Sequence, residues 1–166
     1  MTIKYTEKGP GLHVAIQAAG YSLSQVDGVW TSRNDKAVQA LIDGYTVGEA
    51  RALRKTEISA HATALRNRVI AGYSAGELAS WSLKLGEARA FEASSSAATP
   101  ILSVESSMRG VSLESLVQRV LQNGMMFSMA EAAIAGCEGF HRDALDRCAT
   151  FEEVAAYDFT AGWPKV

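Results

Sequence analysis

The pentapeptide GYSAG at residues 72–76 matches the pattern G-x-S-x-G of serine hydrolases. In those enzymes the serine lies on a sharp turn between a strand of a parallel sheet and a helix. Here residues 68–71 continue a helical pattern, and we find no later strands that could build such a sheet. We therefore predict that Ser74 caps the N-terminus of a helix and is not a nucleophile.

Three side chains that could bind a metal follow one face of a predicted helix, namely Cys137, His141 and Cys148. The first two are four residues apart and could share a zinc ion. Cys148 is about 16 Å further along the helix than Cys137, because a helix rises about 1.5 Å per residue. The same face also carries Ile134 and Leu145, so we interpret all three residues as core packing, with His141 near the edge of the apolar face.

The other candidate groups have simpler explanations. His13 and His61 have no carboxylate or nucleophile at a local spacing that would make either a base, although a partner distant in sequence is not excluded. Glu152 and Glu153 lie in the first turn of a predicted helix, where exposed backbone amides favour negative charge. No glycine-rich phosphate loop follows a strand. The sequence therefore predicts no enzyme, no metal site and no cofactor.

The overall charge gives no indication of a nucleic-acid partner. The 166 residues include 20% charged and 48% hydrophobic residues, with a net charge of −2, which is typical of a globular protein. One helical stretch is basic, with Arg51, Arg54, Lys55, Arg66 and Arg68, but Glu49 and Glu57 are interleaved with it. We favour a solvated helix face over a phosphate-binding surface, because nucleic-acid binding requires clustered basic residues.

The chain shows the pattern of a protein that is made and kept in the cytoplasm. Two cysteines are too few for a disulfide framework, and the first residues, MTIKYTEKGPG, contain no apolar signal core. No apolar run approaches the roughly 20 residues needed to cross a bilayer. We expect no contact with a membrane.

The first 45 residues are predicted to form a small head, and residues 46–166 a helical domain. Leu12, Ala15 and Ile16 have helical spacing. Two short strands, 21–26 and 29–32, flank Asp27-Gly28, a dipeptide typical of a two-residue hairpin turn. A further helix follows, with an apolar stripe that ends at Tyr45. The predicted order is helix, hairpin, helix.

The remaining residues contain repeated helix-start signals. Thr46 with Glu49, Ser74 with Glu77 and Thr150 with Glu153 match the capping box, and Thr99-Pro100 adds a fourth start. The helices are predicted over residues 47–71, 75–93, 100–109, 112–148 and 151–157. Residues 94–98 form the one stretch that resembles a linker.

The segment 112–148 decides the architecture. Its apolar residues keep a spacing of three and four from Leu113 to Cys148, which is typical of a coiled-coil seam. Asn123-Gly124 would normally end a helix, but the apolar pattern continues through it, so we favour one long helix over two. We predict a mostly α fold, an elongated antiparallel helical bundle or hairpin with a small α–β-hairpin–α head.

Aromatic residues near the hairpin and the C-terminus are candidates for binding a partner. Trp30 follows the hairpin turn beside Val29, and the end of the chain carries Phe159, Trp163 and Pro164. Tryptophans frequently anchor interfaces, but each could equally fold back on its own helices. A methionine-rich run, Met125-Met126-Phe127 with Met129, could form a contact surface, and we favour the core for it.

Several short motifs together resemble helical proteins encoded among the tail-fibre genes of tailed phages and prophages. The motifs are VQALIDGY at 38–45, AGYS at 71–74, Trp81 with Glu87-Ala88, Thr99-Pro100, Arg109-Gly110, TFEE at 150–153 and the terminal Trp-Pro. The Trp-Pro ending is similar to that of tail-fibre assembly chaperones, whereas the N-terminal head departs from their pattern. No catalytic or ligand-binding residues are implied by this resemblance.

The resemblance implies a non-enzymatic accessory protein that binds a phage tail-fibre or tail subunit and assists its assembly in the host cytoplasm. The alternative is a permanent component of the virion tail, baseplate or fibre. The long seam also leaves packing against copies of itself open, as a homo-oligomer.

Overall fold

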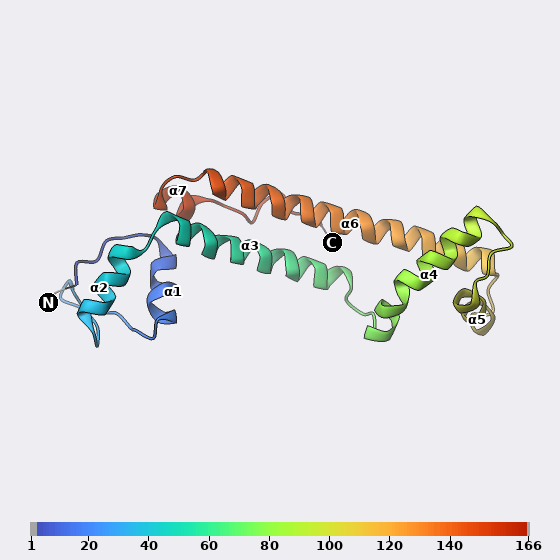
Figure 1. The fold of residues 1–166 in the computed structure, drawn as a ribbon, viewed down its shortest axis with the longest axis horizontal. Coiled ribbons are helices and arrows are strands. Elements are labelled where there is room, and N and C mark those ends of the chain that lie inside the picture. The colour runs from blue at the N-terminus through green and yellow to red at the C-terminus, as the bar shows by residue number, and fades with distance from the viewer. Residues whose placement is uncertain (1–2, 166) are drawn as a thin grey trace. The chain divides into compact units, whose positions relative to one another are not determined.

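A computed structural model describes residues 3–165, and helices dominate this part of the chain (Figure 1). The elements are α1 (Pro10–Ala18), β1 (Ser24–Val26), β2 (Val29–Thr31), α2 (Asp35–Gly44), α3 (Val47–Val69), α4 (Ala75–Ala93), α5 (Pro100–Arg109), α6 (Leu113–Arg147) and α7 (Phe151–Ala156). The predicted mostly α fold class is confirmed. No helix among these residues is both long enough and apolar enough to cross a membrane.

The helices begin where the capping signals predicted. The backbone N–H and the hydroxyl of Thr46 both donate to the Glu49 carboxylate, at 2.6 and 2.8 Å, and the Glu49 N–H donates back to the hydroxyl. These bonds lower the pKa of the Glu49 carboxyl group. Thr150 and Glu153 form the same reciprocal box. Ser74 accepts a bond from the backbone N–H three residues on, as an N-cap does.

Helix α6 runs unbroken for 35 residues, which confirms one helix rather than two. It passes through Asn123-Gly124, where the side chain of Leu85 on α4 lies close to the α6 backbone. A Cβ atom at position 124 would lie 2.8 Å from Cδ1 of Leu85 on α4. The missing side chain therefore admits Leu85 close to the α6 backbone, and the helix continues through a residue of low helix propensity.

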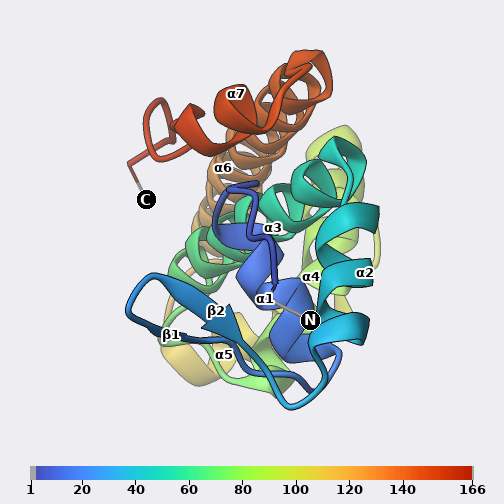
Figure 2. The same cartoon turned by 90° about the vertical axis from the view of Figure 1, so that its left-hand side faces the viewer.

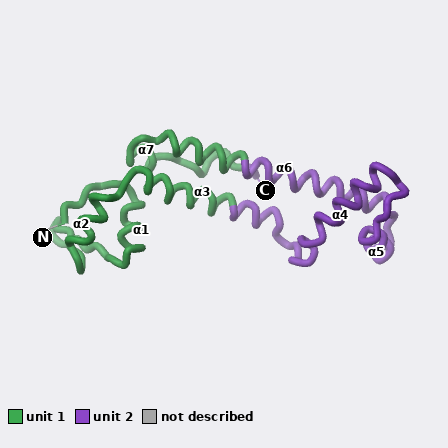
Figure 3. Tube along the Cα trace, viewed as in Figure 1, with its two compact units in different colours: residues 1–62, 136–163 green, residues 63–135, 164–166 purple. Residues whose placement is uncertain are grey.

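The chain divides into two compact units (Figure 3). Unit 1 contains residues 1–62 and 136–163, and unit 2 contains residues 63–135 and 164–166. Helices α3 and α6 contribute residues to both. This division differs from the predicted one at residue 45, because the head shares its core with parts of α3, α6 and α7.

The core of unit 1 explains why the head is not separate. Buried residues of α1 and α2, including Leu12 and Ile42, belong to one cluster with Ile58, Leu145 and Val154. The hairpin lies beside α1 (Figure 2), and Trp30 on β2 makes an isolated bridge to Ile3. A two-stranded ribbon is marginal alone, so this packing is what stabilises it.

Helices α3 and α6 are antiparallel in unit 1, as predicted. Lys55 on α3 pairs with Asp146 on α6 at 2.6 Å, and Ser59 donates a hydrogen bond to Glu138 at 2.8 Å. The residue numbers rise on one helix as they fall on the other. The Lys55 contact lowers the pKa of the Asp146 carboxyl group, which is exposed, so the pair adds little stability.

The basic stretch of α3 is largely committed to contacts within the protein. Besides Lys55, Arg51 donates to the carbonyl of Asp146, and Arg54 pairs with Glu57 at 2.6 Å. In unit 2, Arg66 binds Glu131 at 2.9 Å. These four residues are half-buried in their contacts, which differs from the solvated helix face that the sequence predicted. Arg68 is exposed and makes no ion pair or side-chain hydrogen bond with any residue in the range 3–165.

Unit 2 has a small core between α4, α5 and α6, formed by Ala88, Leu102, Leu116 and Val117. The N-terminus of α5 is capped from another helix. Thr99 makes no side-chain capping bond there, and the Glu87 carboxylate of α4 accepts from the backbone N–H groups of residues 101 and 102, at 3.1 and 2.9 Å. A carboxylate at this position accepts hydrogen bonds from exposed backbone amides, and its negative charge is stabilised by the positive N-terminal end of the helix dipole.

Candidate protein interface

Unit 2 contains a groove with a volume of about 900 Å³. We call it the unit 2 groove. Its walls come from the end of α3, the turn that follows it, and helices α4, α5 and α6. Its apolar lining includes Ile70, Tyr73, Leu78, Trp81, Val120 and Phe127. Apolar clefts of this size are typical binding sites.

Three aromatic rings form a row along the groove. The ring of Tyr73 meets that of Trp81 edge to face, with centroids 4.8 Å apart, and Trp81 meets Phe127 in the same way at 5.4 Å. Tyr73 follows the last turn of α3, Trp81 is on α4 and Phe127 is on α6. Edge-to-face contacts hold the rings in fixed orientations while part of their surface stays open to solvent.

Three methionines of α6 are exposed, and the prediction that they are core residues is wrong. Met125, Met126 and Met129 are 60–68% exposed, and Met126 lines the groove. The reason is the change of neighbours along α6. Arg66 near the end of α3 reaches Glu131, whereas α4 reaches residues 124 and 127. Residues 125–129 thus lie where α3 has ended and α4 covers only one side of the helix.

An ion-paired triad lies at the groove wall. The Glu105 carboxylate binds Lys84 and Arg109, each at 2.7 Å. These contacts, the hydrogen bond from Lys84 first, lower the pKa of the Glu105 carboxyl group. The triad therefore stays charged at neutral pH and carries one net positive charge.

The predicted hairpin residues have different roles. Trp30 stacks on Tyr5, with ring centroids 4.7 Å apart, and meets the edge of His13. It is half-buried and folds back on unit 1. Val29 is exposed and pairs across the turn with Val26, which is also exposed, so the two valines form a small apolar tip.

The aromatic residues near the C-terminus also fold back on unit 1. Trp163 stacks on His141 with centroids 5.4 Å apart, and its indole N–H donates to the carbonyl of Phe159 at 2.6 Å. The guanidinium group of Arg54 lies 4.7 Å from the centre of the Phe159 ring. Pro164 is half-buried and belongs to unit 2. The structure therefore places Phe159 and Trp163 in intramolecular contacts.

His141 lies in the core and not at its edge. Only 4% of its surface is exposed, and both ring nitrogens have partners. Nε2 lies 3.1 Å from the Ala161 carbonyl, which can only accept, so Nε2 carries the proton. Nδ1 lies 2.8 Å from the Tyr157 hydroxyl. Burial raises the pKa of that hydroxyl, which stays protonated and can donate to Nδ1. His141 thus ties the segment 157–163 to α6.

The two cysteines have the environment of structural thiols. Cys137 donates to the Gly162 carbonyl, and burial raises the pKa of its thiol group. A raised thiol pKa opposes formation of the nucleophilic thiolate. Cys148 packs against the core of unit 1. Among residues 3–165, no three His, Cys, Asp or Glu side chains gather in a way that could hold a metal ion.

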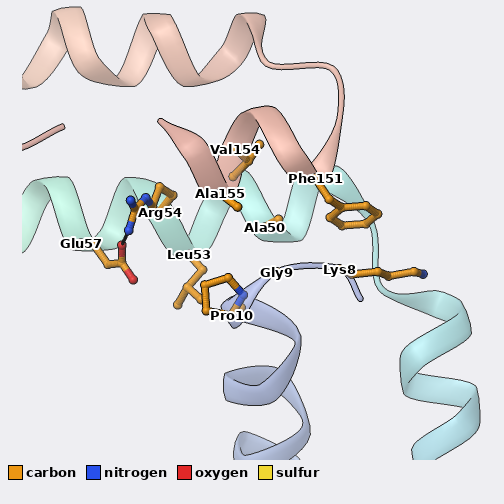
Figure 4. Close-up of a pocket in the computed structure, with 11 residues that line it drawn as sticks. Lys8, Gly9, Pro10, Ala50, Leu53, Arg54, Glu57, Phe151, Val154 and Ala155 are labelled. Atoms are coloured by element: carbon orange, nitrogen blue, oxygen red, sulfur yellow. Dashed lines mark hydrogen bonds and ion pairs between the residues drawn. The ribbon is translucent and has the colours of Figure 1, made fainter. Parts of the chain in front are cut away.

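A second, smaller cavity lies in unit 1 between the start of α1, α3 and α7 (Figure 4). Its lining includes Pro10, Leu53 and Val154, with the Arg54–Glu57 ion pair at one side. Its volume of about 30 Å³ has room for roughly two water molecules, not for a ligand.

Ser74, the centre of the hydrolase-like pentapeptide, is exposed at the first turn of α4 and caps that helix, as predicted. The paired strands among the described residues are β1 and β2 of unit 1, an antiparallel hairpin. Ser74 therefore follows a turn between two helices and not a strand.

Reasoning from the sequence did not identify the groove. Trp81 lies in the predicted helix 75–93 and Phe127 in the predicted helix 112–148, and their rings meet between α4 and α6. The signal that pointed to the groove was the methionine-rich run directly after Gly124, since flexible thioether side chains are common on adaptable binding surfaces. No protein-family model, curated protein or solved structure matches this chain.

Proposed function

We propose that the chain is a non-enzymatic accessory protein of phage tail fibres that binds a fibre or tail subunit and assists its assembly. The observation that supports the binding role is the unit 2 groove, with its aromatic row and the exposed Met126. The assignment to tail fibres rests on the resemblance of the sequence motifs to proteins encoded among tail-fibre genes.

The exposed apolar surface supports a binding role on energetic grounds. Large apolar side chains that stay in contact with water carry a free-energy cost of about 25 cal/mol per Å². Contiguous exposed apolar surface on a soluble protein commonly marks an interaction site. Here Phe127 and Met126 both line the groove and are 37% and 62% exposed. A partner that covers them removes that cost.

The role in assembly follows from the properties of fibre subunits. Before a fibre assembles, its subunits expose apolar surface and unpaired strand edges, which aggregate unless they are covered. A helical protein with an adaptable apolar groove can cover such a surface and release it when subunits associate.

Co-expression with a tail-fibre subunit encoded in the same gene cluster tests this proposal. We expect the subunit to shift from the insoluble to the soluble fraction and to co-purify with this chain. Unchanged solubility together with no co-purification would contradict the proposal. Stoichiometric presence of the chain in purified particles, measured by mass spectrometry, would instead favour the alternative of a permanent virion component.

A further inference from the structure

The unit 2 groove has a charge opposite to that of the whole protein. The chain carries a net charge of −2. The groove, in contrast, is lined by more basic than acidic side chains. The basic ones are Arg68, Lys84, Arg109, Arg119 and Lys165, and the acidic ones are Glu77 and Glu105. The apolar surface is therefore bordered by positive charge.

Two exposed arginines among the basic side chains are available to a partner. Lys84 and Arg109 are held by Glu105 in the triad. Arg68 and Arg119 are both exposed, and neither forms an ion pair or a side-chain hydrogen bond within residues 3–165. An exposed guanidinium group prefers a carboxylate, which it can bind with two parallel hydrogen bonds.

Arg68 lies on α3 and Arg119 on α6, and the two are well separated along the groove. Arg68 is two residues beyond Arg66, whose guanidinium group binds Glu131. Arg119 is twelve residues before Glu131 on the same helix, which corresponds to roughly 18 Å along its axis. A partner that meets both arginines therefore presents carboxylates on the order of three helical turns apart.

The secondary structure of the groove walls indicates which secondary structure the bound segment of the partner has. The walls are helices, the turn after α3, and Lys165, whereas the described strands belong to unit 1. Peptide groups inside helices are already hydrogen-bonded, so the groove has no strand edge to which an extended segment could add. A helix satisfies its own peptide groups and can dock through side chains alone.

We propose that the unit 2 groove binds an acidic amphipathic helix of the partner, an inference that rests on the proposed function. Apolar residues of that helix, at spacings of three and four, pack against Trp81, Phe127 and Met126. Carboxylates that flank its apolar face pair with Arg68 and Arg119. The flexible side chain of Met126 adjusts to the shape of the bound residues.

Two synthetic peptides test this inference on the full-length protein. Both are fluorescein-labelled amphipathic helices with the same apolar face of Leu, Ile and Trp, and their polar positions carry Glu in one and Lys in the other. By fluorescence anisotropy, we expect the Glu peptide to bind at least about tenfold more tightly at low salt, and the difference to shrink at about 0.5 M salt. Equal binding, preference for the Lys peptide, or no binding of either would overturn the inference.

A charge-reversed protein locates the effect. Arg68→Glu with Arg119→Glu is expected to reverse the peptide preference. Arg33→Glu with Arg89→Glu changes the net charge equally, at exposed residues that do not line the groove, and is expected to leave the preference unchanged. Reversal in the control as well would mean that overall charge, not the groove, selects the peptide, which overturns the inference.

The same variants separate the inference from the proposed function. A fibre subunit that co-purifies equally well with the wild type and with Arg68→Glu/Arg119→Glu would overturn the acidic-helix inference and leave the binding function standing. Absence of co-purification with the wild type would contradict the function itself. If a second copy occupies the groove, the free protein sediments as a dimer that Trp81→Ala converts to a monomer, which also overturns the inference.

Discussion

A chain with Trp81→Ala and Phe127→Ala is expected to bind a fibre subunit about 100-fold more weakly than the wild type. Both rings line the unit 2 groove, and each supports the orientation of the other. Large aromatic residues at the centre of an interface commonly contribute about 2 kcal/mol each. Because these two rings touch, their contributions overlap, and we expect a total of about 3 kcal/mol, or roughly 100-fold in affinity. Surface plasmon resonance with the purified subunit measures the change.

The same substitutions are expected to leave the fold intact. Neither ring is among the buried core residues, and the core of unit 2 is centred on other side chains, such as Leu102 and Leu116. A control with Leu83→Ala and Val104→Ala removes exposed apolar side chains of unit 2 that do not line the groove. Equal weakening by the control and by the groove variant would contradict the assignment of binding to the groove.

His141→Ala is expected to lower the free energy of unfolding by about 2–4 kcal/mol and to loosen the segment 157–163. The substitution leaves a cavity beneath Trp163 and removes the partners of the Tyr157 hydroxyl and the Ala161 carbonyl. Each of these losses costs stability where the group is buried. Urea denaturation measures the free energy, and limited chymotrypsin digestion at the aromatic residues of the segment measures its release.

Two further variants separate packing from hydrogen bonding at this position. His141→Leu keeps most of the side-chain volume but leaves both partners unpaired, so we expect an intermediate loss of stability. Asp143→Ala changes an exposed residue of the same helix and is expected to have little effect. A His141→Ala protein as stable as Asp143→Ala, with its C-terminal segment equally protected, would show that His141 does not hold this segment.

Helix ends could be predicted from the sequence because their signals are local. Thr46 with Glu49 and Thr150 with Glu153 lie three residues apart and satisfy each other's backbone amides without help from the rest of the fold. Thr99-Pro100 is a local signal for the start of α5, but no local signal indicates the carboxylate that caps this helix. Glu87 reaches its N-terminus from α4, and only the packed structure brings them together.

Burial was harder to predict, because the spacing of apolar residues along one helix does not show where a neighbouring helix ends. The seam of α6 is buried at Leu116, Ile134 and Leu145. Around Met126 the seam is exposed to solvent, because the neighbouring helix changes there from α3 to α4. The two compact units do not divide at the predicted boundary, residue 45, for a related reason, since the head packs on segments such as α7 that are distant in the sequence.

The predicted partner-binding aromatics show the same limit. Trp30 and Trp163 were recognised as anchors, but residue type does not tell whether an aromatic ring binds another protein or its own chain. In unit 1 both find intramolecular partners, Tyr5 for the first and His141 for the second. The rings of unit 2 that remain partly open to solvent lie on segments whose patterns predicted only capping and core packing.

Hydrogen–deuterium exchange of the free chain and of its complex with a fibre subunit tests the central claim most directly. We expect binding to slow exchange in residues 68–85 and 119–130, which line the groove, and to leave the hairpin at 24–31 unchanged. Slower exchange confined to the hairpin and to residues 157–163 would contradict the account, because the partner would then bind unit 1.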